Sequence, residues 1–205
     1  MSLDDWHLFF ISVCIIIVLV SFSPIFMTYM QRKEEAFLSL AVLGEEGMAE
    51  HYYPDEDVSI KVGEQVSWTI YVNNRIGEAQ YVAVKVKLLN YSILSPNSTL
   101  CIHCTAPVVY EFRRVLLDNE TWHFPFNWSI RNVEWVGDNL SIKSFSLNGD
   151  LINTNIVALH GYNYRFVLEL WTFDEKIGDF KFGWRYDDED FYCAWNQVWF
   201  NVTTI

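Results

Sequence analysis

The most pointed chemical motif in this chain is Cys101-Ile-His-Cys104, a C-x-x-C pair with a histidine inside it. Thiolates and imidazole rings bind zinc and copper, and a C-x-x-C pair can also cycle between dithiol and disulfide. A thioredoxin-like site needs a βαβ setting, which the sequence does not show. Metal binding or carrying through Cys101, His103 and Cys104 is an alternative interpretation, and it needs further ligands. The candidates for these are Cys193, His123 and His160.

The simpler interpretation of the cysteines is structural. Outside the cytoplasm thiols tend to oxidise, so a disulfide could join Cys101 to Cys104, or tie that loop to Cys193. Either pairing leaves one of these three cysteines over, and the sequence does not choose between them. Cys14 lies in an apolar segment, where we interpret it as a small apolar side chain.

Asparagines in N-x-[S/T] tripeptides form a second chemical feature. Such a tripeptide accepts a glycan only in a compartment that glycosylates proteins, and every one of the six follows the membrane-length apolar segment. The excess predicts that residues 36–205 lie outside the cytoplasm. The predicted acceptors are Asn90, Asn97, Asn119, Asn127, Asn139 and Asn201.

Two acidic runs, Asp187–Asp190 and Asp55–Asp57, could hold Ca²⁺, but neither has the spacing of an EF-hand loop, and solvated loops are favoured. No G-x-S-x-G, H-E-x-x-H, Walker or Rossmann glycine pattern occurs. We therefore expect no enzyme activity and no cofactor.

Aromatic residues recur at every second position between Asp179 and Asp187. This face could be a platform for sugars or a partner protein, although a buried strand face is the commoner case. A carbohydrate-binding module is therefore a further alternative. The residues concerned are Phe180, Phe182, Trp184 and Tyr186.

The element that would place these residues outside the cell is the segment 8–30, which carries no charge. At about 1.5 Å per residue it is long enough for a helix to cross a bilayer core of about 30 Å. The acidic start, with Asp4 and Asp5, favours a retained anchor over a cleaved signal peptide. Arg32 and Lys33 after the segment would favour a cytoplasmic C-terminal side, but long domains cross largely regardless of charge, so the glycosylation sites decide the orientation.

Residues 36–205 are predicted to form strands, because apolar and polar residues alternate between turn-forming residues. Short antiparallel strands of this kind predict an immunoglobulin-like β-sandwich. In this register Asn127 and Asn201 lie on polar faces, while Asn90 is ambiguous. The predicted strands are Val66–Asn73, Tyr81–Leu88, Thr121–Ser129, Tyr164–Leu170, Asp179–Asp187 and Val198–Thr203.

The predicted organisation is a tail at residues 1–7, a transmembrane anchor at 8–30, a linker at 31–35 and a β-sandwich domain at 36–205. The aromatic fraction of 17% supports a sizeable core. A formal net charge of −12 and the lack of a Lys/Arg stripe argue against nucleic acid as a partner.

Residues 36–90 carry a strand at Phe37–Gly44, a Glu/Gly/Ala segment up to Glu50, then Tyr53-Pro54 and a strand after Gly63. This order resembles the largely archaeal family called domain of unknown function 1616. The resemblance implies an extracytoplasmic, membrane-associated β-sandwich with no assigned activity. One departure is that Val72 and Asn73 are adjacent, with Asn74 in the spaced position. The matching residues are Leu43, Gly44, Glu46, Gly47, Ala49, Glu50, Pro54, Gly63, Glu64, Val72 and Asn73.

The sequence therefore predicts a single-pass, N-glycosylated membrane protein with its C-terminal domain outside the cell. The expected role is structural or protein-binding, as a component of the cell envelope or as an accessory subunit of a membrane complex. The expected partners are membrane lipid around residues 8–30, N-linked glycans and one or more proteins.

Overall fold

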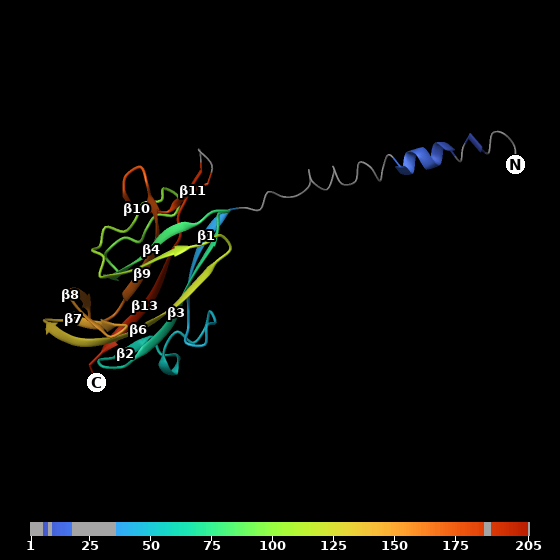
Figure 1. Cartoon of the computed structure of the whole chain (residues 1–205). Coiled ribbons are helices and arrows are strands. Elements are labelled where there is room, and N and C mark those ends of the chain that lie inside the picture. The colour runs from blue at the N-terminus through green and yellow to red at the C-terminus, as the bar shows by residue number, and fades with distance from the viewer. Residues whose placement is uncertain (1–5, 8–9, 18–35, 187–189, 205) are drawn as a thin grey trace. The chain divides into compact units, whose positions relative to one another are not determined.

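A computed structural model describes residues 6–7, 10–17, 36–186 and 190–204. The chain divides into two compact units, Met1–Glu35 and Ala36–Ile205. The second unit is a sandwich of two β-sheets packed face to face (Figure 1). The prediction of a mostly β fold is confirmed.

The first sheet contains five strands in the order β1-β3-β6-β7-β8, and every neighbouring pair is antiparallel. Tight turns at Gly137-Asp138 and Asn148-Gly149 join the last three strands, as the turn signals predict. The bounds are β1 Phe37–Leu43, β3 Val66–Arg75, β6 Thr121–Val136, β7 Asn139–Leu147 and β8 Asp150–Leu159.

The second sheet has the order β2-β13-β9-β4-β5, with β10 paired to β9 as well. Its pairs are antiparallel except for β2 and β13, which run parallel. The strands β11 and β12 form a separate two-stranded ribbon. The bounds are β2 Ser59–Lys61, β4 Gln80–Asn90, β5 Tyr110–Leu116, β9 Tyr164–Asp174, β10 Asp179–Phe182, β11 Trp184–Tyr186, β12 Asp190–Tyr192 and β13 Trp195–Thr203.

The core lies between the two sheets, and aromatic rings fill its centre. Trp68 of β3 stacks on Phe126 of β6 at 5.5 Å between ring centroids and meets Phe166 of β9 edge-on at 6.0 Å. Such pairs contribute about 0.5–1.5 kcal/mol beyond the burial of their area. The inward faces predicted from alternation are confirmed, as β3 buries every second residue from Val66 to Asn74.

The predicted strand Asp179–Asp187 is wrong as a single element. It breaks at Gly183, whose φ is +87° and whose missing Cβ would lie 2.2 Å from the Tyr192 carbonyl oxygen. Phe180 and Phe182 therefore pair with β9, while Trp184 begins the ribbon and packs into the main core. A side chain at position 183 would prevent this close approach of β12.

The outer face of the second sheet carries charged residues. Lys87, Arg165 and Glu169 alternate with the apolar residues of β4 and β9 that face the core. In the structure all three side chains are buried. The cause is the connection between β4 and β5, residues 91–109, which packs over this face; we call it the strap.

In the first unit, residues 6–7 and 10–17 are helical. Within the described residues, no helix has both the length and the apolar character needed to cross a membrane. The predicted anchor at 8–30 extends over residues 8–9 and 18–30, which lie outside the described part of the chain.

Candidate functional site

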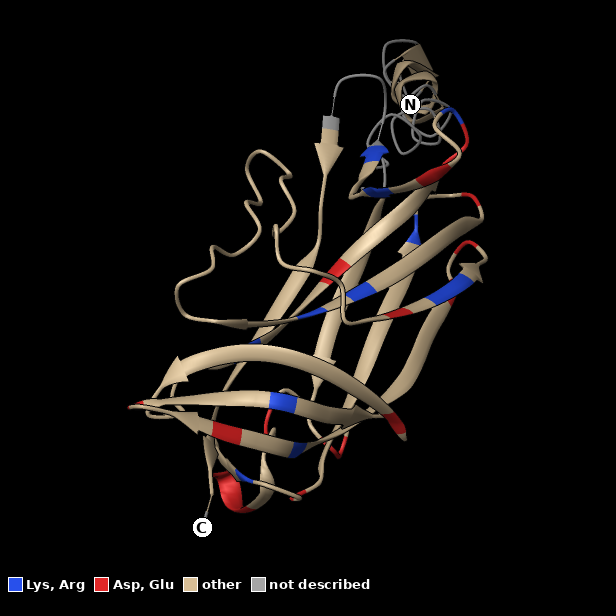
Figure 2. Ribbon diagram, turned by 90° about the vertical axis from the view of Figure 1, so that its left-hand side faces the viewer, with Lys and Arg blue, Asp and Glu red and all other residues tan. Residues whose placement is uncertain are grey.

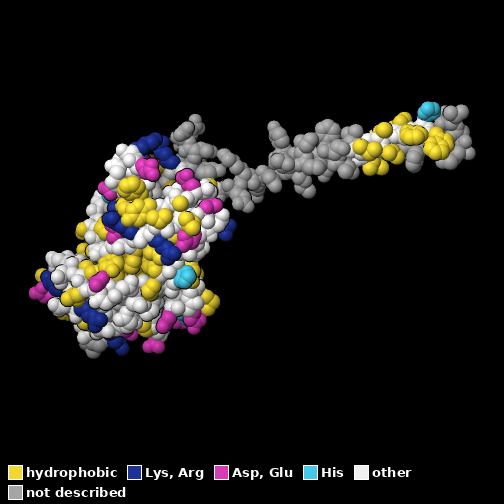
Figure 3. All heavy atoms as spheres, viewed as in Figure 1, with side chains coloured by type: hydrophobic (Ala, Val, Ile, Leu, Met, Phe, Trp, Pro, Cys, Tyr) yellow, Lys and Arg dark blue, Asp and Glu magenta, His cyan; other side chains and the backbone are white. Residues whose placement is uncertain are grey.

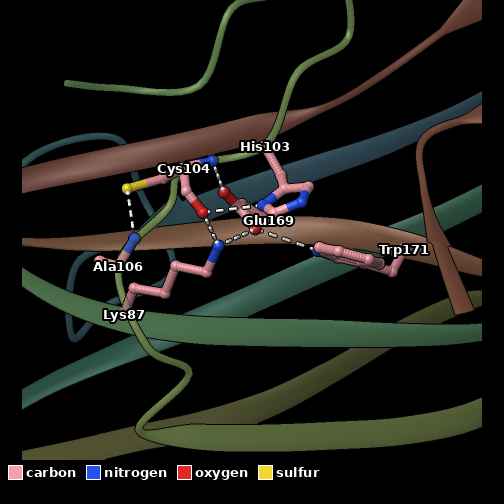
Figure 4. A network of polar contacts seen from close by, with 6 residues as sticks. All are labelled: Lys87, His103, Cys104, Ala106, Glu169 and Trp171. Atoms are coloured by element: carbon pink, nitrogen blue, oxygen red, sulfur yellow. Dashed lines mark hydrogen bonds and ion pairs between the residues drawn. The ribbon is translucent and has the colours of Figure 1, made fainter.

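A buried ion pair fastens the strap to the sheet. Lys87 Nζ lies 2.8 Å from Glu169 Oε2, and the two side chains are 2% and 0% exposed. Glu169 Oε1 accepts the backbone N–H of Cys104 at 2.7 Å, and Lys87 donates to the Cys104 carbonyl (Figure 4). The pair therefore satisfies both backbone groups of one strap residue while neutralising its own charge.

Aromatic groups surround this ion pair. Trp171 of β9 donates its indole N–H to Glu169 Oε2 at 3.1 Å, and the Lys85 ammonium lies 3.8 Å from the Trp171 ring centroid. The His103 ring lies 5.0 Å from the Trp171 ring, and its Nδ1 is 2.8 Å from the Cys104 carbonyl. Because a carbonyl only accepts, that nitrogen carries a proton.

Arg165 forms a second clamp further along β9. Its guanidinium donates to the Ser95 hydroxyl and to Gln197 Oε1, each at 2.8 Å, and to the Ile93 carbonyl. The guanidinium carbon also lies 4.5 Å from the ring centroid of Trp199. Desolvation by burial lowers the pKa of Arg165, and these bonds stabilise its charge.

A small apolar cluster lies between the two clamps. Leu89 and Val167 of the sheet bury their side chains against Cys104 and Ala106 of the strap, with Ile93 and Trp195 at the margin. The strap is thus held by charge, hydrogen bonds and apolar contact together. A connection held in this way has a defined shape, although it contains no long strand or helix.

The structure separates the three residues of the predicted metal site. Cys104 turns its sulfur into the apolar cluster, whereas the His103 ring points to the opposite side, toward Trp171 (Figure 4). Cys101 lies instead beside Cys193. Among the described residues, no group of three or more His, Cys, Asp or Glu side chains could hold a metal ion.

The two histidines considered as further ligands lie apart from the strap. His123 stacks on Tyr71 at 5.7 Å on the first sheet, and His160 is exposed in a turn. Asp55 and Glu56 form the short turn η1 (Pro54–Glu56), red near the C-terminus in Figure 2. Of the other acidic run, residues 187–189 lie outside the described part of the chain.

The six predicted glycan acceptors all lie on strands or loops outside the core. Asn97 in the strap, Asn119 in the β5–β6 turn and Asn127 on β6 are exposed. Asn127 also lines a polar surface hollow with Gln65, Ser67, Arg131 and others. By contrast Asn74, which is not an acceptor, is fully buried and binds the Glu78 and Leu116 carbonyls.

The remaining three acceptors are half-buried. Asn90, which the sequence left ambiguous, donates its amide N–H to the Val157 carbonyl of β8 at 2.7 Å. Asn201 accepts the backbone N–H of Asn163 at 3.0 Å, and Asn139 begins β7. Asn90 therefore has a structural contact that a glycan would have to displace.

An aromatic patch lies at the other end of the same outer face. We define it as Tyr81, Val115 and Phe173, which are 38%, 55% and 37% exposed. Tyr81 pairs with Val115 across β4 and β5, and its ring lies 5.8 Å from that of Phe173. Phe180 packs beneath them, 4.9 Å from the Tyr81 ring, with the Arg113 guanidinium over it. Figure 3 shows hydrophobic side chains gathered beside Lys and Arg on one face of the domain.

Sequence reasoning missed the buried charges and the patch. Lys87, Arg165 and Glu169 alternate with apolar residues, and this pattern is the same for a covered face and for a solvated one. The one available signal was the long connection after β4, which returns to the neighbouring strand β5 and so has to lie close to that face.

Comparison with known proteins does not assign a family. No family model matches the chain, and no curated protein matches it. The resemblance to domain of unknown function 1616 therefore stays a prediction.

Solved structures give distant likenesses. One is the CARDB domain of a Pyrococcus furiosus protein in complex with di-metal ions: 12% identity, 85% of this chain, all of that chain, TM-score 0.39. Another is Spo0M, a sporulation control protein from Bacillus subtilis: 12% identity, 82% of this chain, 50% of that chain, TM-score 0.36. A third is a β-glucosidase from Listeria innocua: 11% identity, 82% of this chain, 16% of that chain, TM-score 0.38. At these TM-scores the likenesses establish no common function.

Proposed function

We propose that this chain is a membrane-anchored, N-glycosylated protein whose immunoglobulin-like sandwich lies outside the cell and binds other proteins. It acts as an accessory subunit of a membrane complex or as a component of the cell envelope. The observation that carries the proposal is the aromatic patch on the outer face of the second sheet. Clustered exposed aromatic residues beside arginine are typical of protein-binding surfaces.

The strand pairing places the patch at one end of the sandwich. Phe37, the first residue of β1, pairs with Arg75 at the end of β3, and the following turn leads directly into β4 and Tyr81. The patch therefore lies at the end of the sandwich where the chain enters the domain.

The strands of the patch carry no predicted glycan acceptor. The strand segments that build the patch, 80–86, 110–116, 171–174 and 179–182, contain none of the six asparagines. Exposed acceptors lie instead on the strap, on the β5–β6 turn and on the first sheet. Glycans on Asn97 and Asn127 would lie on other surfaces, whereas Asn119 lies in the turn that follows the patch strand β5.

The test is purification of the full chain from native membranes in mild detergent, comparing wild type with Phe173→Ser. Leu151→Ser is the matched control, because Leu151 is 65% exposed on β8 of the other sheet. We expect a stoichiometric subunit to co-purify with wild type and the control, and to be lost from Phe173→Ser. Equal recovery from all three would overturn the patch as the binding surface, and a lone monomer in every case would favour the envelope role.

A second measurement tests the location. Intact-mass spectrometry of native protein before and after deglycosylation reports glycan occupancy and anchor retention together. Native protein with no glycan, and with a domain that resists protease added to whole cells, would contradict the extracellular orientation.

A further inference from the structure

Two cysteines far apart in the sequence meet at the tip of the strap. Cys101 lies in the strap, and Cys193 lies between β12 and β13. Each sulfur is 3.6 Å from the same acceptor, the Ser98 carbonyl oxygen, and the two thiols are close enough to interact electrostatically. The Cys101 sulfur is also 3.7 Å from the Phe191 carbonyl of β12. All four cysteines of the chain are present as thiols in this structure.

The third cysteine of the domain is excluded from this pair. The Cys104 sulfur accepts the backbone N–H of Ala106 at 3.4 Å inside the small apolar cluster, and the residue is 2% exposed. Its backbone is fixed by Lys87 and Glu169, so its sulfur could reach Cys101 only by leaving the apolar cluster and the Ala106 N–H. A Cys101–Cys104 bond would therefore cost these buried contacts of Cys104.

We propose that Cys101 and Cys193 form a disulfide that fastens the tip of the strap to the segment before β13, and that Cys104 remains a buried thiol. The surroundings already hold the partners in place: the Trp195 indole donates to the Ser98 hydroxyl at 2.8 Å, and Asn97 and Ile102 pair their backbones across the turn that contains Cys101. Both sulfur-bearing residues are partly exposed, which gives an oxidant access.

The reaction with glutathione disulfide balances as thiol–disulfide exchange. The Cys101 thiolate attacks one glutathione sulfur, forming a mixed disulfide and releasing the first glutathione thiolate. The Cys193 thiolate then attacks the Cys101 sulfur and releases the second, and each released thiolate takes up one of the protons that the two cysteines lost. Burial and the contact with Cys101 raise the pKa of Cys193.

The disulfide would stabilise the folded domain and restrain the strap. It closes a long loop of chain, including β5 to β12, so it removes much conformational freedom from the unfolded state. For a domain of this size we expect reduction to lower the Tm by roughly 5–15 °C. It should also loosen the strap, whose exposed tip includes Leu94 and Leu100.

The experiment uses the full chain in detergent, oxidised with glutathione disulfide, so its result does not depend on the cellular location proposed above. Non-reducing peptide mapping should give one linked peptide that contains Cys101 and Cys193, with Cys104 alkylated only after unfolding. A Cys101–Cys104 peptide, or alkylation of both Cys101 and Cys193 in the oxidised native protein, would overturn the proposal.

Thermal melting with and without reductant gives a second readout. Wild type and the control Cys104→Ala should both lose thermal stability on reduction, whereas Cys101→Ser and Cys193→Ser should melt at the same temperature in both conditions. A reductant-dependent shift that persists in Cys101→Ser, or disappears in Cys104→Ala, would assign the bond to another pair.

Discussion

Lys87 and Glu169 form an ion pair on β4 and β9, two neighbouring strands of the second sheet, 2.8 Å apart and buried beneath the strap. Taking both charges out of water costs several kcal/mol, and their mutual attraction repays this only with good geometry and further hydrogen bonds. The Cys104 backbone and the Trp171 indole supply those bonds. The pair thus fixes where the strap lies.

Removing one partner of this pair should destabilise the protein strongly. Glu169→Gln and Lys87→Met each leave a buried charge without its counter-ion, so we expect each to lower the free energy of unfolding by about 3–5 kcal/mol. The double variant should lose clearly less free energy of unfolding than the two single variants together, because no uncompensated charge remains. Chemical denaturation of all three variants measures this coupling.

The exposed pair Lys143–Glu134, at 2.9 Å on the first sheet, provides the matched control. Glu134→Gln should cost no more than about 1 kcal/mol, because solvent screens that pair. Equal losses from Glu134→Gln and Glu169→Gln would show that the strap does not exclude water from the buried pair.

Gly183 should be intolerant of any side chain. Its Cβ would lie 2.2 Å from the Tyr192 carbonyl oxygen, whereas a Cβ at Gly178, also at positive φ, meets nothing within 4 Å. Gly178→Ala should therefore cost about 1–2 kcal/mol for the backbone conformation alone. Gly183→Ala should cost about 1–3 kcal/mol more for the clash. Thermal melting of the two variants separates the backbone strain from the clash. Equal losses of thermal stability in Gly178→Ala and Gly183→Ala would refute the close approach of β12.

Stability should fall in alkali because of Tyr164. Its hydroxyl is buried and donates to the Leu140 carbonyl, and desolvation raises its pKa from 10.0 to about 12. Between these values the unfolded state loses the proton that the folded state keeps, so this contribution is complete below pH 10 and is lost as pH rises toward 12. The loss is about 2–3 kcal/mol for a shift of this size.

Denaturant titrations at pH 9 to 12 check this prediction. Tyr164→Phe removes the titrating group, so its free energy of unfolding should depend less steeply on pH over that range than that of wild type. The same slope in both proteins would mean that other groups cause the alkaline loss.

If the domain faces a glycosylating compartment, the six asparagines should differ in glycan occupancy. Asn97, Asn119 and Asn127 are exposed and should carry glycans. Asn90 should stay largely unmodified because its amide binds the Val157 carbonyl. Glycopeptide mass spectrometry of native protein measures the occupancy of each site.

Substitution separates the two kinds of asparagine. Asn127→Gln should remove one glycan with little change in stability, whereas Asn90→Gln should cost about 1 kcal/mol through its lost hydrogen bond. A glycan on Asn90 in protein that lacks one on Asn127 would contradict the assignment made from burial.

Local sequence pattern determined much of the sandwich. Alternation has a period of two residues, and so does the direction of side chains along a strand, so the inward faces of β3 and β6 could be predicted from Trp68 and Phe126 and their neighbours. The turns at Asn74–Gly77 and Asn148-Gly149 follow from the backbone freedom of glycine and asparagine. These features depend on residues close together in the chain.

What lies over an outward face is a matter of tertiary structure. The sequence pattern around Lys87 and Glu169 is the same as that around solvated charged residues. These two side chains are buried only because the strap returns across β4 and β9. The meeting of Cys101 with Cys193, and the break of the last aromatic strand at Gly183, likewise depend on the path of chain segments distant in sequence. The pattern of a strand fixes which way each side chain points, but the packing of the whole domain decides whether it meets water, a partner residue or another strand.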